Sequence, residues 1–452
     1  METLSTMEPD QPTPHWKDQL KARISELRHN AFVSTSALSA TAQVIVMAAG
    51  FVSAKILAEY LGREGVGYFN QFTKFIATAT IFSSLGLTSG VTKYVAEFRD
   101  RPGERAGFIS TGFLLVLSGT LVTSLLLMLF PSFFNEWTFE GKLEFSYLFV
   151  LFGVLLILTN LNFFVISVFN GLQMYRTVVM RNIYQACSAL VLHLALTIWW
   201  GLPGALLGLV LTQSLIFVLL LPEMRHKAYL KPSELTGHFR REYVPLYAKF
   251  MVMVLAANLF GNLLQLQLQN NVIGQIGASA LGEMTAVFKI SSIYLNIATG
   301  IIGLYFLPKF AAEPDPEKLG LLLRRTLTVI VGFVVIGGTG FMLLKSILIP
   351  LFFKAEFLTA TPLVKYQVCG DLFKGAGYVL SYLLIARGRT YAYLVAEIAC
   401  GSSYYVISKL LLASSGIEAL MIGYVVSNVL YLLILAVITF RMVTRGMSKK
   451  FI

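Results

Sequence analysis

The chain has 452 residues, of which 56% are hydrophobic and only 13% are charged, and its formal net charge is +12 at pH 7. With a mean hydropathy of +0.71, this composition excludes an ordinary soluble globular protein. Apolar runs long enough to cross a bilayer as helices recur from residue 31 to residue 440. They predict an all-α polytopic membrane protein, because a β-barrel would show short alternating strands instead.

Residues 1–30 are predicted to form a cytoplasmic N-terminal extension. The first part is polar and contains proline, whereas His15 to Asn30 interleaves apolar and basic residues. That pattern predicts a short basic amphipathic helix at the membrane surface. The basic region continues into a full-length span without an obvious cleavage site, which is not the pattern of a signal peptide.

About twelve spans follow, and the weakest division, between the fifth and the sixth, is marked only by the turn residues of Gly201 to Gly204. The predicted spans lie near 31–57, 66–92, 107–131, 145–170, 182–200, 203–222, 246–272, 280–307, 325–350, 362–386, 391–413 and 416–440.

Most of the 36 Lys and Arg residues fall in alternate loops and in the two terminal segments. Because basic residues stay on the cytoplasmic side of a membrane, both termini are expected to be cytoplasmic. The positive charge is then explained by topology and does not imply a nucleic-acid partner.

Landmarks recur at an offset of 215 residues. Gly62, Gly67 and Lys74 are matched by Gly277, Gly282 and Lys289, and two later glycines, Gly201 and Gly208, are matched by Gly416 and Gly423. We therefore expect two six-helix lobes, residues 31–222 and 246–440, joined by a basic cytoplasmic linker (223–245) and followed by a basic cytoplasmic tail (441–452). An even number of spans per lobe predicts a pseudo-two-fold axis along the membrane normal, with a central cavity between the lobes.

The apolar stretch from Lys365 to Glu397 carries four polar residues on one predicted helix. Asp371, Lys374, Tyr378 and Tyr382 are spaced by three, four and four residues, which places them on one face. A charge at mid-membrane costs roughly 2.5–3.5 kcal/mol on insertion scales. This face is therefore predicted to line a wet protein interior; the alternative is an Asp–Lys pair that only locks helices together.

Other ionisable residues also fall inside spans. Lys74 and Lys289 occupy matching positions well inside spans two and eight, and Lys is suited to phosphate oxygens. They predict a cationic cavity for a phosphate or diphosphate. Lys55, four residues before Glu59, either joins this set or reaches out to the membrane surface. The turns around Tyr175 and Tyr391 repeat at an offset of 216, and with that offset Arg181, at the start of span five, lies at the repeat position of Glu397.

Span seven carries Asn258, Asn262, Gln265 and Gln269, spaced by four, three and four residues. This stripe either lines the cavity or makes interhelical hydrogen bonds, which average about 0.6 kcal/mol each in membranes.

The sequence contains no P-loop, no His–Glu metal motif and no GxSxG, and its three cysteines have no metal-ligand spacing. A transporter is therefore expected rather than an enzyme, without a cofactor. Its energy would come from a proton or sodium gradient, or from the substrate gradient.

Several motifs together are informative: Gly90 to Ala96 (GVTKYVA), Gly370 to Lys374 (GDLFK), Tyr382 to Ala386 (YLLIA) and Ala396-Glu397. Over about residues 35–440, the chain resembles the polysaccharide-flippase branch of the multidrug/oligosaccharidyl-lipid/polysaccharide exporter superfamily, the branch of the lipid III flippases and O-antigen translocases. The resemblance implies twelve helices in two lobes around a V-shaped cavity in a bacterial inner membrane.

The resemblance also implies the substrate, an undecaprenyl-diphosphate-linked oligosaccharide of the lipid III or O-antigen unit type, moved from the cytoplasmic to the periplasmic leaflet. It implies a polysaccharide polymerase and a chain-length regulator as further partners besides the bilayer. By motif match, it carries over Lys55, Asp371, Lys374 and Glu397 as functional positions. The chain departs from the pattern in its N-terminal extension and at Gln269-Asn270, where relatives often place a basic residue.

These observations combine into one expected mechanism, alternating access by rocking of the two lobes. The residues expected to attract the diphosphate are Lys74, Lys289 and Lys374. Asp371 and Glu397 would hold Lys374 and Arg181 in place, or carry a coupling proton. The residues expected to contact sugar hydroxyls are Asn258, Asn262, Gln265, Tyr378 and Tyr382.

Three alternatives remain. A cation-coupled multidrug exporter of the same fold would favour acidic residues in the first lobe. A lipid II flippase would have two more helices. A polymerase or ligase would need catalytic residues in a large periplasmic loop, and the longest such loop, 132–144, has no Arg or His.

Overall fold

The computed structural model describes residues 31–227 and 239–448, and every span predicted above falls within them. The amphipathic helix predicted in residues 1–30, residues 228–238 of the basic linker and the last four residues of the tail lie outside the described residues, as does the side chain of Asn258.

The described residues are almost entirely helical, and no strand occurs among them. The helices are α2 (Ala31–Ser83), α3 (Thr88–Glu97), α4 (Pro102–Leu129), α5 (Pro131–Phe139), α6 (Ser146–Gly171), α7 (Tyr175–Lys227), η1 (Arg241–Tyr243), α9 (Val244–Asn258), η2 (Leu259–Leu263), α10 (Leu264–Gln275), α11 (Ala278–Ile301), η3 (Ile302–Phe306), α12 (Leu307–Ala312), α13 (Pro316–Phe352), η4 (Ala355–Leu363), α14 (Val364–Ala386), α15 (Thr390–Ser415) and α16 (Glu418–Ser448).

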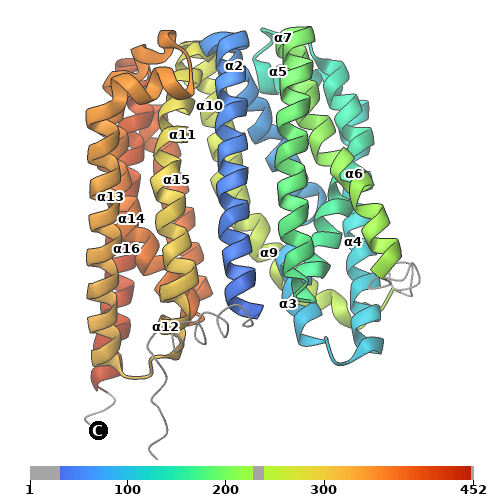
Figure 1. Cartoon of the computed structure of the whole chain (residues 1–452), viewed down its shortest axis with the longest axis vertical. Helices are drawn as coiled ribbons and strands as arrows, with labels where there is room; N and C mark the ends of the chain where they lie inside the picture. The colour runs from blue at the N-terminus through green and yellow to red at the C-terminus, as the bar shows by residue number, and fades with distance from the viewer. Residues whose placement is uncertain (1–30, 228–238, 449–452) are drawn as a thin grey trace, which may run out of the picture.

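The expected twelve-span arrangement in two lobes is confirmed. Nine helical segments of the described chain are long and apolar enough to cross a membrane, and two of them, Thr41–Ser83 and Tyr175–Val218, each contain two spans. The remaining span is α9, η2 and α10 in succession. Figure 1 shows the first lobe in blue to green and the second in yellow to red.

Glycines with positive φ divide the double spans. α2 bends at Gly62 (φ 65°) and α7 bends at Gly201 (φ 61°). Their repeat partners, Gly277 (φ 106°) and Gly416 (φ 55°), separate α10 from α11 and α15 from α16. Side chains with a Cβ rarely adopt this backbone conformation, so the glycine positions determine where each pair of spans folds back.

Several boundaries differ from the prediction; α13, for example, begins at Pro316 rather than near 325. Two of the differences change the elements themselves. The second span was expected to continue to residue 92, but α2 ends at Ser83 because Leu85 and Gly86 take positive φ (53° and 62°). The segment 132–144, expected to be a loop, begins within the short helix α5.

The lobes are related as the 215-residue repeat predicts. A methyl group added to Gly67 would lie 2.0 Å from the carbonyl oxygen of Ala278, and one added to Gly282 would lie 1.9 Å from the carbonyl oxygen of Arg63. Adding 215 to Gly67 gives Gly282, and subtracting 215 from Ala278 gives Arg63, so the two contacts are repeat partners. The helices α2 and α11 therefore cross at a reciprocal, glycine-mediated contact on the pseudo-two-fold axis.

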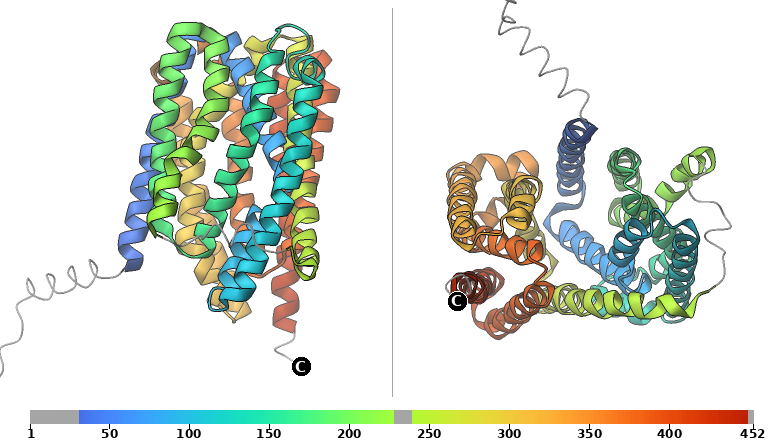
Figure 2. Two further views of the ribbon diagram at one scale, coloured as in Figure 1. Left: turned by 90° about the vertical axis from the view of Figure 1, so that its right-hand side faces the viewer. Right: turned by 90° about the horizontal axis from the view of Figure 1, so that it is seen from below.

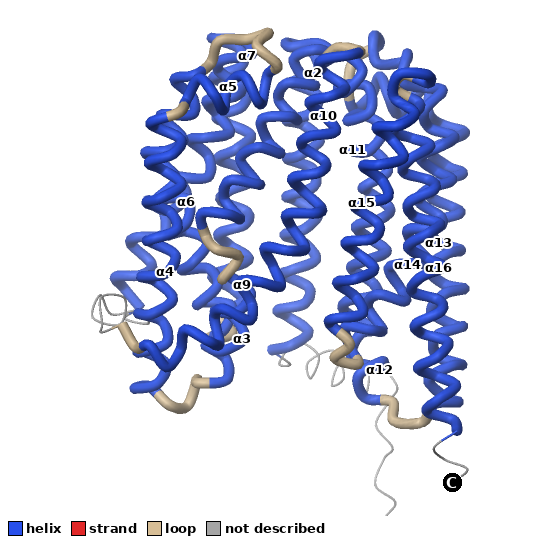
Figure 3. Tube along the Cα trace, turned by 180° about the vertical axis from the view of Figure 1, so that it is seen from behind, coloured by secondary structure: helices blue, strands red, loops and turns tan. Residues whose placement is uncertain are grey.

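The two lobes meet at the end of the molecule that carries Gly62 and Gly277, which we call the glycine end. Figure 3 shows the lobes close together at this end and diverging toward the end with α3 and α12. At the glycine end, Arg63 of α2 forms an ion pair of 2.5 Å with Glu283 of α11. Thr359 donates a hydrogen bond of 2.6 Å to the same carboxylate.

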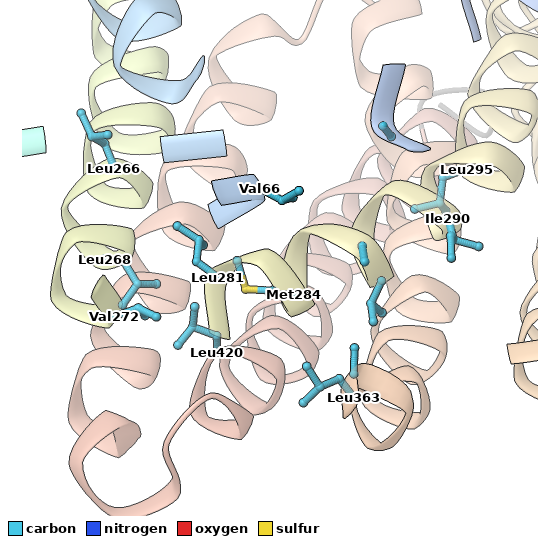
Figure 4. Close-up of a cluster of buried hydrophobic side chains, with 14 of the residues drawn as sticks. Val66, Leu266, Leu268, Val272, Leu281, Met284, Ile290, Leu295, Leu363 and Leu420 are labelled. Carbon is cyan, nitrogen blue, oxygen red and sulfur yellow. The ribbon is translucent and has the colours of Figure 1, made fainter. Parts of the chain in front are cut away.

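An apolar cluster lies beneath these polar contacts and contains residues of both lobes. Figure 4 shows Val66 of α2 beside Leu281 and Met284 of α11, with Leu268 of α10 next to Leu281. All four side chains are at least 96% buried. Burial of this apolar surface, together with van der Waals packing between helices, stabilises the closed glycine end.

Helix α9 departs from the repeat because it lies along the first lobe, as the right-hand view in Figure 2 shows. Tyr247 stacks on Phe108 of α4 at 4.3 Å between ring centroids and donates a hydrogen bond of 2.9 Å to the Phe108 carbonyl. The π-helix η2 then redirects the span toward the second lobe.

Candidate functional site

A cavity of about 810 Å³ lies between α2 of the first lobe and α10, α11, α14, α15 and α16 of the second. Seven of the predicted site residues line it: Lys74, Asn262, Gln265, Lys289, Lys374, Tyr378 and Glu397. The structure thus brings together residues that are separated by more than 300 positions in the sequence.

Three lysines give the cavity its charge. Lys74 and Lys289 are repeat partners on α2 and α11, and Lys374 comes from α14. The Lys74 ammonium donates a hydrogen bond of 3.1 Å to Gln265 Oε1. The Lys374 ammonium lies 5.1 Å from the ring centroid of Tyr424 and 5.8 Å from that of Tyr378. These ring contacts hold the charge without neutralising it.

The predicted pairing of Asp371 with Lys374 is not a direct ion pair. Asp371 is fully buried and does not line the cavity. Its carboxylate accepts hydrogen bonds from Tyr294, from Tyr424 (2.6 Å) and from Gln367 (2.9 Å). No ion pair joins it to Lys374 in the described part of the chain, although the two charges lie three residues apart on α14 and still attract each other.

Glu397 lines the cavity and accepts a hydrogen bond of 2.5 Å from the hydroxyl of Tyr431. It does not meet Arg181, which is buried in the first lobe and donates to Asn162 (3.3 Å) and Asn182 (3.1 Å). The repeat offset of 215 also pairs Glu397 with Asn182 rather than with Arg181. The offset of 216 at the turns near Tyr175 and Tyr391 had selected Arg181 instead.

Two further predicted residues lie away from the cavity. Lys55 donates to the backbone carbonyls of Pro350 (3.0 Å) and Phe353 and forms an ion pair of 3.2 Å with Glu59. It therefore joins the lobes at the glycine end. Tyr382 packs with the buried apolar cluster and faces Gly303.

The predicted amide stripe does line the cavity at Asn262, Gln265 and Gln269. Gln269 is 2% exposed, and its Oε1 accepts no hydrogen bond from any described residue. The stripe provides polar groups opposite the tyrosines of the second lobe.

Sequence reasoning missed most of the aromatic wall. Beyond the predicted set, the cavity is lined by Asn70, Phe288, Tyr393, Tyr404, Tyr424, Asn428 and Tyr431, among others. Tyr393, Glu397, Cys400 and Tyr404 are spaced by four, three and four residues on α15. The spacing rule applied to span seven would have found them, since it selects one face of a helix.

Comparison with known proteins gives a consistent assignment. The family model described as "Polysaccharide biosynthesis protein" matches residues 32–312. The chain is 23% identical over 409 residues to the lipid III flippase of Escherichia coli (strain K12), covering 89% of this chain and 96% of that protein. The same figures hold for the lipid III flippase of Shigella flexneri.

Solved structures share the fold. An inward-facing multidrug resistance MATE family transporter of the MOP superfamily superposes with a TM-score of 0.71 at 13% identity, covering 91% of this chain and 99% of that one. The lipid II flippase MurJ, in an inward closed conformation, gives 0.67 at 14% identity and covers 89% of this chain and 87% of that one. Because the family model covers more than half of the chain, this protein belongs to the polysaccharide biosynthesis protein family.

Proposed function

We propose that this protein is a flippase that moves an undecaprenyl-diphosphate-linked oligosaccharide from the cytoplasmic to the periplasmic leaflet. The observation that carries the proposal is the composition of the cavity. Lys74, Lys289 and Lys374 line it together with Glu397, whose carboxylate is already hydrogen-bonded to Tyr431. Ammonium groups bind phosphate oxygens as point charges, so the cavity favours a diphosphate.

The remaining lining suits a glycan. Amides from α10 face tyrosines from α14, α15 and α16 across the cavity. Amides and phenols donate and accept hydrogen bonds, as sugar hydroxyls require, and aromatic rings offer apolar surface to sugar faces. The names of the similar lipid III flippases support the same class of substrate.

The transport step is proposed to be alternating access. The contacts between Arg63 and Glu283 and the apolar cluster close the glycine end. The loops that carry most Lys and Arg lie at the opposite end, which positions them in the cytoplasm of an inner-membrane protein. The structure then corresponds to a cytoplasm-facing state, and the higher TM-score to an inward-facing transporter (0.71) than to an outward-facing one (0.62) supports this.

Energy coupling is part of the proposal. A proton or sodium gradient, or the substrate gradient itself, would drive the cycle, with Asp371 or Glu397 as the carboxylate that takes part. A polysaccharide polymerase and a chain-length regulator would receive the product in the outer leaflet.

Complementation tests the proposal. The gene would be expressed in a strain that lacks its lipid III flippase, alongside Lys374→Ala and Asp371→Ala, and surface antigen would be assayed with membrane expression as the control. Rescue by the wild type but not by the variants is expected. Failure of the well-expressed wild type to rescue would refute lipid III as the substrate, and drug efflux from vesicles would then favour the multidrug exporter.

A further inference from the structure

A second chamber, of about 560 Å³, lies in the first lobe between α2 and α7. Its polar lining consists of Gln43, Ser53, Asn182, Gln185 and His193 of the first lobe and Lys289 of the second. The function proposed above does not use the first-lobe side chains of this set.

The two chambers are repeat partners. Adding 215 to residues of the first-lobe chamber gives residues of the cavity described above: Ala42, Val46, Gly50, Asn182, Gln185 and Ala189 become Ala257, Gly261, Gln265, Glu397, Cys400 and Tyr404. Each chamber also receives a lysine from the opposite lobe, Lys289 in one case and its repeat partner Lys74 in the other. The first-lobe chamber is therefore the counterpart of the cavity rather than an irregularity of packing.

Lys289 connects the two spaces, since its side chain lines both of them. A ligand group bound by this ammonium in the first-lobe chamber would be at the boundary of the cavity.

The chemistry of the two chambers differs at one repeat position. The cavity described above has the carboxylate of Glu397 where the first-lobe chamber has the amide of Asn182. Among the described residues, no carboxylate lines the first-lobe chamber. Asn182 Oδ1 accepts the hydrogen bond of Arg181, which leaves the Asn182 NH₂ group as a donor. The chamber is thus positively charged and presents donors.

His193 also indicates that this chamber binds a ligand. It is 92% buried, it lines the chamber, and neither of its ring nitrogens has a hydrogen-bond partner among the residues that the structure describes. A buried imidazole without a partner is unfavourable, and the N–H of this ring is available to a ligand.

We propose that the diphosphate of the lipid-linked substrate reaches from the cavity into the first-lobe chamber at Lys289. One phosphate would lie in the first-lobe chamber, bound by Lys289, His193 and the Asn182 amide, while the cavity binds the other phosphate, through Lys74 and Lys374, and the glycan. This assignment rests on the function proposed above and divides the substrate between two repeat-related subsites. The alternative to ligand binding is a packing role for His193, whose ring lies 5.4 Å from the Phe69 ring between centroids and faces Gly208.

The test uses the full chain in phosphatidylcholine nanodiscs, with farnesyl diphosphate, farnesol and phosphatidylglycerol as separate probes. The variant is His193→Leu, and His193→Gln retains a donor. The matched control is Thr197→Val, one turn along the same helix. Thr197 is 99% buried, its hydroxyl has no partner within the described part of the chain, and it does not line the chamber.

Wild type and Thr197→Val should bind farnesyl diphosphate equally and farnesol weakly. His193→Leu should bind farnesyl diphosphate about tenfold more weakly, as expected for loss of a hydrogen bond to a charged group, and His193→Gln should recover part of the affinity. Equal binding by His193→Leu and wild type would overturn the proposal. A His193-dependent affinity for phosphatidylglycerol without one for farnesyl diphosphate would assign the chamber to phospholipid headgroups and overturn it too.

Transport separates this inference from the proposed function. If wild type rescues the flippase-deficient strain but farnesyl diphosphate binding is insensitive to His193, only the subsite assignment fails. If wild type itself gives no rescue, the flippase proposal fails.

Discussion

Replacing Gly282 by alanine is expected to destabilise the contact between the lobes. The added methyl carbon would lie 1.9 Å from the carbonyl oxygen of Arg63 and 2.8 Å from its carbonyl carbon. Both are backbone atoms, so no side-chain rotation relieves the clash, and α2 and α11 must separate by about 1 Å to restore van der Waals contact.

The magnitude follows from two opposing effects. Alanine is about 1 kcal/mol more favourable than glycine inside a helix, whereas overpacking of a close contact typically costs about 1–3 kcal/mol. Gly300 provides the control because it lies on the same helix α11 and a methyl group there would meet nothing within 4 Å. Gly300→Ala should therefore melt at or above the wild-type temperature, and Gly282→Ala should melt below it.

The assay is thermal unfolding of the detergent-solubilised protein, followed by loss of monodisperse protein after heating. Gly67→Ala, the repeat partner of Gly282→Ala, should behave like it, because its methyl carbon would lie 2.0 Å from the Ala278 carbonyl oxygen. If Gly282→Ala and Gly300→Ala melt at the same temperature, the glycine crossing does not hold the lobes together and the reasoning fails.

Three further outcomes are expected. Lys374→Met should abolish transport while Lys374→Arg retains part of it, because a cation held near the rings of the cavity is needed; equal transport by both would contradict a role for the charge. Asp371→Leu should lower stability by about 1–3 kcal/mol, since the change leaves buried hydroxyl and amide donors without their acceptor, and an unchanged melting temperature would exclude this. Single and double alanine variants of Arg63 and Glu283 should show a coupling energy of about 1 kcal/mol or less in stability, because the Arg63 side chain is 33% exposed. A cysteine introduced at the glycine end should nevertheless react faster with a thiol-reactive probe in these variants, and unchanged labelling would argue against a role of the ion pair in closing this end.

The sequence alone determined the membrane character, the division into two lobes and the main turn positions. The length of an apolar run shows directly whether it can cross a bilayer as a helix. Glycines such as Gly62 and Gly277 mark turns whose backbone conformation residues with a Cβ rarely adopt. The match of Lys74 with Lys289 was also visible in the sequence, because a repeat keeps the same residue spacing in both lobes.

Only the tertiary structure decided which polar residues share a space. Helical spacing placed Asp371 and Lys374 on one face, yet Tyr294 and Tyr424 surround the carboxylate while the ammonium reaches the cavity. The sequence left Lys55 either in the cationic set with Lys74 or at the membrane surface, and the structure shows that it binds backbone carbonyls at the glycine end. Periodicity reports which side chains of a helix lie together, and the neighbouring helix that covers them depends on the packing of the whole bundle.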